Sequence, residues 1–103
     1  MIVDEHANID AIIESFGDDL FVIKFSAEWC GPCKSYNPVL DMLESEHDIG
    51  VIHVDISVRP DLGERYRIMS VPTTHIYKYG KSVHSFVGAK PLGALLDEIG
   101  RYA

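Results

Sequence analysis

The spacing of hydrophobic residues alternates along this chain between a helical and a strand pattern, and this alternation restricts the fold to a few architectures. Apolar residues recur at positions i, i+3, i+4 and i+7 in segments 9–16 and 92–99, which predicts two amphipathic helices. Compact β-favouring runs at 20–25 and 51–56 predict strands that are covered on both faces. Helices that alternate with such strands indicate an α/β protein.

Capping residues and prolines indicate where the other helices begin or bend. Asn8 is a suitable N-cap for the first helix, and Gly17 suits the position just after its last turn. A longer helical pattern covers 31–46, and Pro38 inside it predicts a kink because proline has no N–H donor and clashes with the preceding turn. Pro60 is expected to open a short third helix.

Two further β-favouring runs, 74–79 and 82–87, are joined at Tyr79-Gly80-Lys81. This spacing and its glycine predict a hairpin of two antiparallel strands. An antiparallel pair added to the earlier strands gives a central mixed β-sheet with helices on both faces.

Length and charge narrow the class of protein. The chain has 103 residues, so a single domain over 1–103 is expected. Its net charge of −7 disfavours nucleic acid and anionic membranes as ligands. No basic leader precedes an apolar segment, and the longest apolar run, 20–23, is too short to span a bilayer, so we expect a cytoplasmic protein.

The only two cysteines, Cys30 and Cys33, form a CxxC motif between a predicted buried strand and a predicted helix. At that place a helix N-terminus favours a thiolate on Cys30, and residues three apart lie close enough for a disulfide. We therefore interpret Cys30 as the nucleophile and Cys33, expected to be less exposed, as the resolving thiol. Gly31 and Pro32 between them suit a helix start.

Segment 25–34, Phe-Ser-Ala-Glu-Trp-Cys-Gly-Pro-Cys-Lys, resembles the active-site segment of thioredoxins. The resemblance covers essentially the whole chain and implies a thioredoxin-like fold. Further matches are Pro38 in the active-site helix, Val71-Pro72-Thr73 as the cis-proline segment, Tyr79-Gly80 in the hairpin, and Val87-Gly88-Ala89 beside the substrate groove.

The resemblance implies a protein-disulfide reductase that acts by dithiol–disulfide exchange and is recharged by a thioredoxin reductase. It implies protein disulfides as substrates, and we also expect a monomer without a cofactor or a metal. A cis bond before Pro72 would let Val71 offer backbone groups to an extended substrate. By the same resemblance, Trp29, Gly31, Pro32 and Lys34 support the cysteines, and Val71, Pro72, Gly88 and Ala89 bind substrate.

The chain departs from the family at Lys24, where thioredoxins usually have a buried acid. A charged Lys24 would favour a thiolate on Cys33, a desolvated one could act as a base, and a third interpretation lets its ammonium reach water. His53 could relay protons or be structural, and Asp55 on the same strand face could restore a carboxylate. We hypothesise that Lys24 raises the reduction potential of the Cys30–Cys33 disulfide. A disulfide oxidase or isomerase therefore remains an alternative function.

Two other classes of function compete with the reductase. Two thiolates supply half of a zinc site, but no second CxxC or paired histidine motif supplies the rest. Alternatively, the domain serves as a docking subunit of a larger complex with its cysteines idle. Three arginines close together in sequence are interpreted as surface charge: Arg59, Arg65 and Arg67. The five histidines are scattered: His6, His47, His53, His75 and His84.

Overall fold

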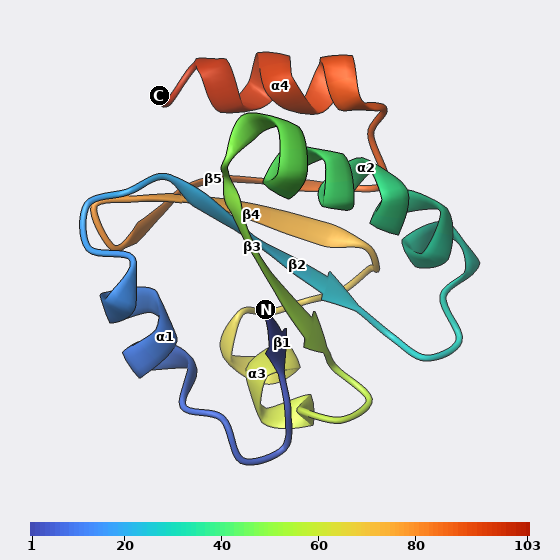
Figure 1. The fold of residues 1–103 in the computed structure, drawn as a ribbon. Coiled ribbons are helices and arrows are strands. Elements are labelled where there is room, and N and C mark those ends of the chain that lie inside the picture. Colours follow the sequence, from blue (N-terminus) through green and yellow to red (C-terminus); the bar gives the residue numbers. More distant parts are fainter.

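The computed structural model describes residues 1–103 and has the expected mixed sheet with helices on both faces. The strands form one sheet in the order β1-β3-β2-β4-β5 (Figure 1). In chain order the elements are β1 (Ile2–Val3), α1 (Ile9–Ser15), β2 (Phe21–Ser26), α2 (Gly31–His47), β3 (Gly50–Asp55), α3 (Pro60–Arg65), β4 (Thr73–Lys78), β5 (Lys81–Val87) and α4 (Leu92–Gly100).

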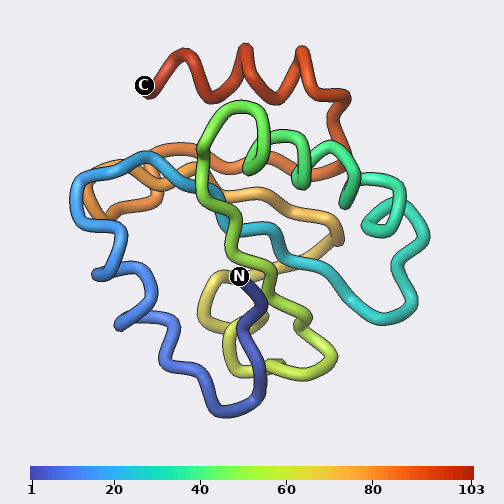
Figure 2. The backbone as a smooth tube through the Cα atoms, in the orientation of Figure 1, coloured from blue at the N-terminus to red at the C-terminus, as the bar shows by residue number.

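Strand β2 lies at the centre of the sheet, as its continuous apolar run predicts. It pairs in parallel with β3 and antiparallel with β4, so that Lys24 lies between His53 on one side and Thr74 on the other. The sequence did not predict β1, which is only two residues long and has no periodicity to detect. β1 runs parallel to β3, and the tube in Figure 2 shows the N-terminal segment beside that strand.

Alternate residues of the central strands pack against different helices (Figure 1). Phe21, Ile23 and Phe25 of β2 belong to a core cluster with residues of α1 and α3. Val22 belongs to a second cluster with Tyr36 and Leu40 of α2 and with residues of α4. Because side chains alternate along a strand, Lys24 faces the α2 side of the sheet.

The capping residue, the two helix prolines and the hairpin turn lie in the predicted elements, and the kink at Pro38 stays a prediction. The Asn8 side chain accepts from the Ala11 N–H at 3.1 Å and caps α1. Pro60 is the first residue of α3, and Pro38 lies inside α2. The hairpin between β4 and β5 has a two-residue loop, Tyr79-Gly80, with positive φ angles of 55° and 73°.

Candidate active site

The two cysteines lie where the chain passes from β2 into α2. The Cys30 N–H donates to the Ala27 carbonyl at 3.1 Å, and α2 begins at the next residue, Gly31. Cys30 is the N-cap of this helix, with extended backbone angles (φ −92°, ψ 105°), and Pro32 lies in the first turn. A proline there costs no helical hydrogen bond, so the sequence between the cysteines favours a helix start.

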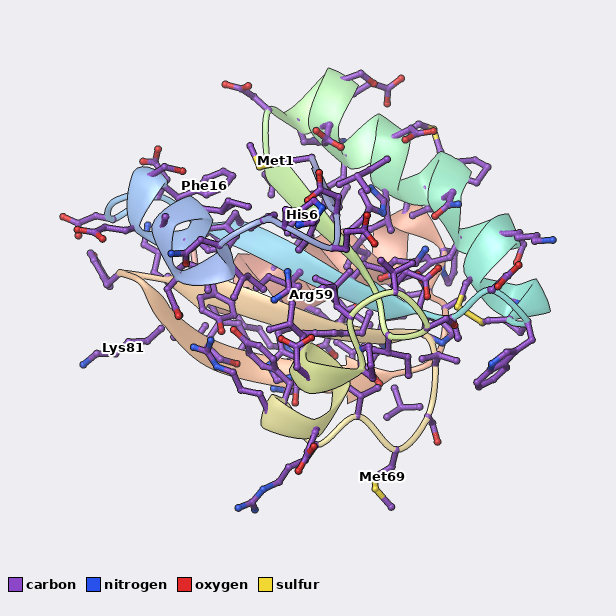
Figure 3. The ribbon with its side chains drawn as sticks, turned by 90° about the horizontal axis from the view of Figure 1, so that it is seen from below. Met1, His6, Phe16, Arg59, Met69 and Lys81 are labelled. Carbon is purple, nitrogen blue, oxygen red and sulfur yellow. A yellow bond between two sulfur atoms is a disulfide. The ribbon has the colours of Figure 1, made fainter.

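Cys30 and Cys33 form a disulfide with their Cα atoms 5.4 Å apart, drawn in yellow at the start of α2 in Figure 3. The Cys33 N–H donates to Cys30 Sγ at 3.1 Å. Exposure hardly distinguishes the two residues, at 4% for Cys30 and 3% for Cys33, so the expected difference in burial is negligible. Their asymmetry is one of position, because Cys30 precedes the helix and receives a backbone N–H.

Apolar side chains surround the disulfide. Ala27 packs with the two cysteines in a small buried cluster, and the half-buried Ile56 and Val71 pack against it. The Val71–Pro72 bond is cis, as the resemblance implied. The Pro72 carbonyl accepts from the Gly88 N–H at 2.8 Å, so the structure brings these two predicted substrate-binding segments together.

The surface next to the cysteines is open. Trp29 is 76% exposed, which excludes the core packing that is common for a tryptophan. Val71 and Gly88 are half-buried, and Pro72 is buried. Four other predicted site residues are exposed: Gly31, Pro32, Lys34 and Ala89.

Lys24 is buried, with 3% of its surface exposed, so the interpretation in which its ammonium reaches bulk water is wrong. Its Nζ donates to Asn37 Oδ1 at 2.8 Å. Asn37 follows Cys33 by four residues, which places both on one side of α2. The substituted position is thereby connected to the helix that carries the second cysteine.

Lys24 and His53 both line a cavity of about 380 Å³ between β1, β2, β3 and α2. Burial lowers the pKa of Lys24, and the Asp55 carboxylate partly opposes this. Burial also lowers the pKa of His53 to about 4, with smaller contributions from Lys24 and the Met1 ammonium, so the imidazole is neutral near pH 7. The other residues that line the cavity are Ile2, Ser26, Asn37, Asp41 and Asp55.

Sequence reasoning missed Asn37 and Ile56. The spacing of Asn37 from Cys33 could have indicated it, since residues four apart share a helix face. Ile56 carries no comparable signal, because its contact with the cysteine cluster depends on the return of β3 beside β2.

The family model described as Thioredoxin matches residues 1–101. The chain belongs to the thioredoxin family. It is 39% identical over 90 residues to a thioredoxin of Chlamydia trachomatis, covering 86% of this chain and 88% of that protein. It is 34% identical over 104 residues to a thioredoxin of Mycobacterium tuberculosis, covering 93% of this chain and 90% of that protein.

Solved thioredoxin structures have the same fold. Chlamydomonas reinhardtii thioredoxin f2 superposes with a TM-score of 0.88 at 30% identity, covering 99% of this chain and 94% of that one. The oxidised thioredoxin of Plasmodium falciparum superposes with a TM-score of 0.82 at 36% identity, covering 99% and 96%.

Family membership and the bonded CxxC pair together identify a thiol–disulfide oxidoreductase. Thioredoxins in general act on protein disulfides and are reduced by a thioredoxin reductase. No helix of this thioredoxin combines the length and apolar character needed to cross a membrane. No three side chains among its His, Cys, Asp and Glu residues gather as metal ligands.

Proposed function

We propose that this chain reduces protein disulfides, with Cys30 as the nucleophile and Cys33 as the resolving thiol. The Cys30 thiolate attacks one sulfur of a substrate disulfide, forming a mixed disulfide and releasing the other sulfur as a thiolate that takes a proton. The Cys33 thiolate then attacks Cys30 Sγ and releases the second substrate sulfur. The substrate disulfide gains two electrons and two protons, and the protein dithiol becomes the Cys30–Cys33 disulfide.

The hydrogen bond from the Cys33 N–H to Cys30 Sγ carries this assignment of roles. An N–H that already points at this sulfur, at the positive end of a 17-residue helix, stabilises negative charge on Cys30 once the disulfide opens. Cys33 lies within the first helical turn and has no equivalent position.

The surface around the cysteines suits an extended substrate segment. Trp29, Gly31 and Pro32 present an exposed rim without charge, and Lys34 follows on α2. Val71 has backbone groups available for strand-like pairing, whereas Pro72 has no N–H to donate. Gly88, whose N–H donates to the Pro72 carbonyl, would border the other side of the substrate segment together with Ala89.

Lys24 would assist proton transfer at Cys33 from its place beside Asn37, one helical turn after that cysteine, and His53 would support Lys24 in the polar cavity. The bond to Asn37 orients the Lys24 amine toward α2, and its lowered pKa suits a group that exchanges a proton. The imidazole of His53 lines the same cavity, and its pKa of about 4 leaves it a neutral, weakly basic group near pH 7, so it would assist as a hydrogen-bonding side chain.

We further propose that residues 1–103 act as one domain and as a monomer in the cytoplasm, where thiols are kept reduced. A thioredoxin reductase would recharge the cysteine pair, and protein disulfides would be the substrates. No cofactor beyond the cysteines, no nucleic acid and no membrane takes part in this proposal.

Trapping experiments with single cysteine variants test the roles. Cys33→Ser should accumulate a mixed disulfide between Cys30 and a protein substrate, whereas Cys30→Ser should not, as read by non-reducing electrophoresis and mass spectrometry. Trapping through Cys33 instead would overturn the assignment. A Cys30→Ser, Cys33→Ser double variant that keeps its cellular role would favour the docking alternative.

The reduction potential tests the direction of the reaction. A value near that of other thioredoxins, about −270 mV, would support a reductant. A value above about −200 mV would instead support the oxidase or isomerase alternative.

A further inference from the structure

An apolar groove lies on the α3 side of the disulfide, and its Met69 precedes the substrate-binding Val71 by two residues. Its volume is about 510 Å³, and its lining includes Ile56, Pro60, Gly63, Ile68 and Met69. The residue that joins it to the active site is Ile56, which also packs against the Cys30–Cys33 cluster. A polypeptide whose sulfur has reached Cys30 can therefore continue from Ile56 into this groove.

Two features shape the groove: α3 packs closely on Ile56, and the Met69 side chain is exposed. A Cβ at Gly63 would lie 3.1 Å from Ile56 Cγ2, so the glycine allows a close approach between helix and strand end. Met69 is 92% exposed and projects away from the fold (Figure 3). A flexible thioether left in water beside an apolar groove is suited to closing over an apolar side chain.

Arg67 is the charged residue that distinguishes this groove. Arg59 is paired with Asp61, Arg65 with Asp10, and Arg101 lies near Glu98. Arg67, the remaining arginine, has neither an ion pair nor a side-chain hydrogen bond, and it lines the groove. In a chain of net charge −7, this unpaired guanidinium offers a local positive charge to a partner.

The backbone at Arg67 lies in the left-handed region and ends α3. Arg67 has φ 54°, its N–H donates to the Glu64 carbonyl, and the Ile68 N–H donates to the Gly63 carbonyl. These bonds form a Schellman motif, in which the left-handed position is usually glycine because a Cβ there is unfavourable. At this position Arg67 places its side chain at the groove.

We propose that this groove binds a segment of the substrate protein next to its reactive cysteine, and that it selects an apolar residue beside an acidic one. The apolar side chain would lie between Ile56, Ile68 and Met69, and the carboxylate would pair with Arg67. Glu64, one turn before Arg67, also lines the groove and repels a carboxylate at its α3 end, which fixes where the acidic residue lies. This inference rests on the proposed reduction of protein disulfides.

Kinetics with synthetic peptides tests the charge preference. Each short peptide carries one leucine and one cysteine, and the cysteine is in a disulfide with 2-mercaptoethanol. Glu, Gln or Lys is placed in turn at each position next to the leucine. The reduced protein should prefer Glu to Gln about two- to fivefold in kcat/KM at one position, an effect that salt diminishes. Arg67→Gln should abolish this preference, and Glu64→Gln should increase it.

Lys81→Gln is the matched control, because it removes one positive charge at the distant hairpin. If Arg67→Gln and Lys81→Gln behave alike across the peptide series, the proposal is wrong. The disulfide of 2-mercaptoethanol itself, which is small and uncharged, should be reduced at the same rate by every variant. Loss of that reaction in the unmodified protein would instead overturn the proposed reductase function.

Truncation of Met69 tests the apolar contact. Met69→Ser should lower kcat/KM for leucine peptides about three- to tenfold relative to serine peptides, whereas Met42→Ser, at an exposed position on α2, should not. In a mixed disulfide of the Cys33→Ser variant with a Glu-Leu peptide, methyl NMR signals of Ile56, Ile68 and Met69 should shift. Unchanged signals there would place the peptide elsewhere and overturn the proposal.

Discussion

The Nζ of the buried Lys24 donates to Asn37 Oδ1 at 2.8 Å and so bridges the central strand to the helix that carries Cys33. An ammonium in this place favours negative charge on the reduced cysteine pair, whereas burial favours the neutral amine. The Asp55 carboxylate supports the charged form. The balance between these effects sets how strongly Lys24 acts on the disulfide.

Replacing Lys24 should therefore change the reduction potential. Lys24→Asp should lower it by on the order of 10–30 mV, and Lys24→Met should lower it less, because each removes a positive charge that stabilises the thiolate form. Equilibration in defined dithiol buffers, with thiol trapping and mass spectrometry, gives the value. Lys81→Met, at the hairpin, is the control, and a potential in Lys24→Asp equal to or above the unmodified value would reject the hypothesis.

His53 should make stability depend on pH. In the folded protein the pKa of His53 is about 4, whereas in the unfolded chain it is near 6.5. The unfolded state thus binds more protons between these values, and the free energy of unfolding should fall as the pH decreases through this window. The loss from this group should be on the order of 1–2 kcal/mol, allowing for its partial exposure to water.

Urea unfolding at about pH 7.5 and pH 4.5 measures this effect. His53→Gln should lose less stability on acidification than the unmodified protein, since it lacks the imidazole whose pKa differs between the folded and unfolded states. His47→Gln, on the exposed end of α2, should behave like the unmodified protein. Equal losses in all three would show that His53 does not titrate as described.

A buried hydrogen bond links α2 to β4. The Tyr36 hydroxyl and Thr74 Oγ1 are 2.9 Å apart, and both residues are almost completely buried. Thr74→Val leaves the tyrosine hydroxyl without a partner, which should lower the free energy of unfolding by about 1–3 kcal/mol. Tyr36→Phe with Thr74→Val should cost less than the sum of the single changes, and strict additivity in chemical unfolding would contradict the coupling.

Much of this fold is predictable because its signals are local. The cap at Asn8, the hairpin loop Tyr79-Gly80 and the buried run of β2 each act through neighbouring residues. β1 is different, since two residues become a strand only when β3 is present to pair with them. Its recognition requires the tertiary structure.

Some features of the candidate site can likewise be predicted from the sequence, and others depend on the tertiary structure. The spacing of Cys30 and Cys33 at a helix start is visible in the sequence, and so is the cis-proline segment by resemblance. The burial of Lys24 is not, because a lysine in a strand can lie in the core or reach water, and only the packing of α2 over β2 decides. The pairing of Arg59 and Arg65, which leaves Arg67 free, depends on partners that the fold brings together, such as Asp10.

Trp29 should separate function from stability. Its side chain is 76% exposed next to the disulfide, so Trp29→Ala should change the free energy of unfolding by no more than about 0.5 kcal/mol. Loss of a large aromatic contact surface should nevertheless lower kcat/KM for protein disulfides by about tenfold. Tyr79→Asn, which removes an exposed aromatic ring at the distant hairpin and suits its left-handed backbone, should leave kcat/KM unchanged. A Trp29→Ala protein that reduces substrates as well as Tyr79→Asn would show that substrates do not contact this rim.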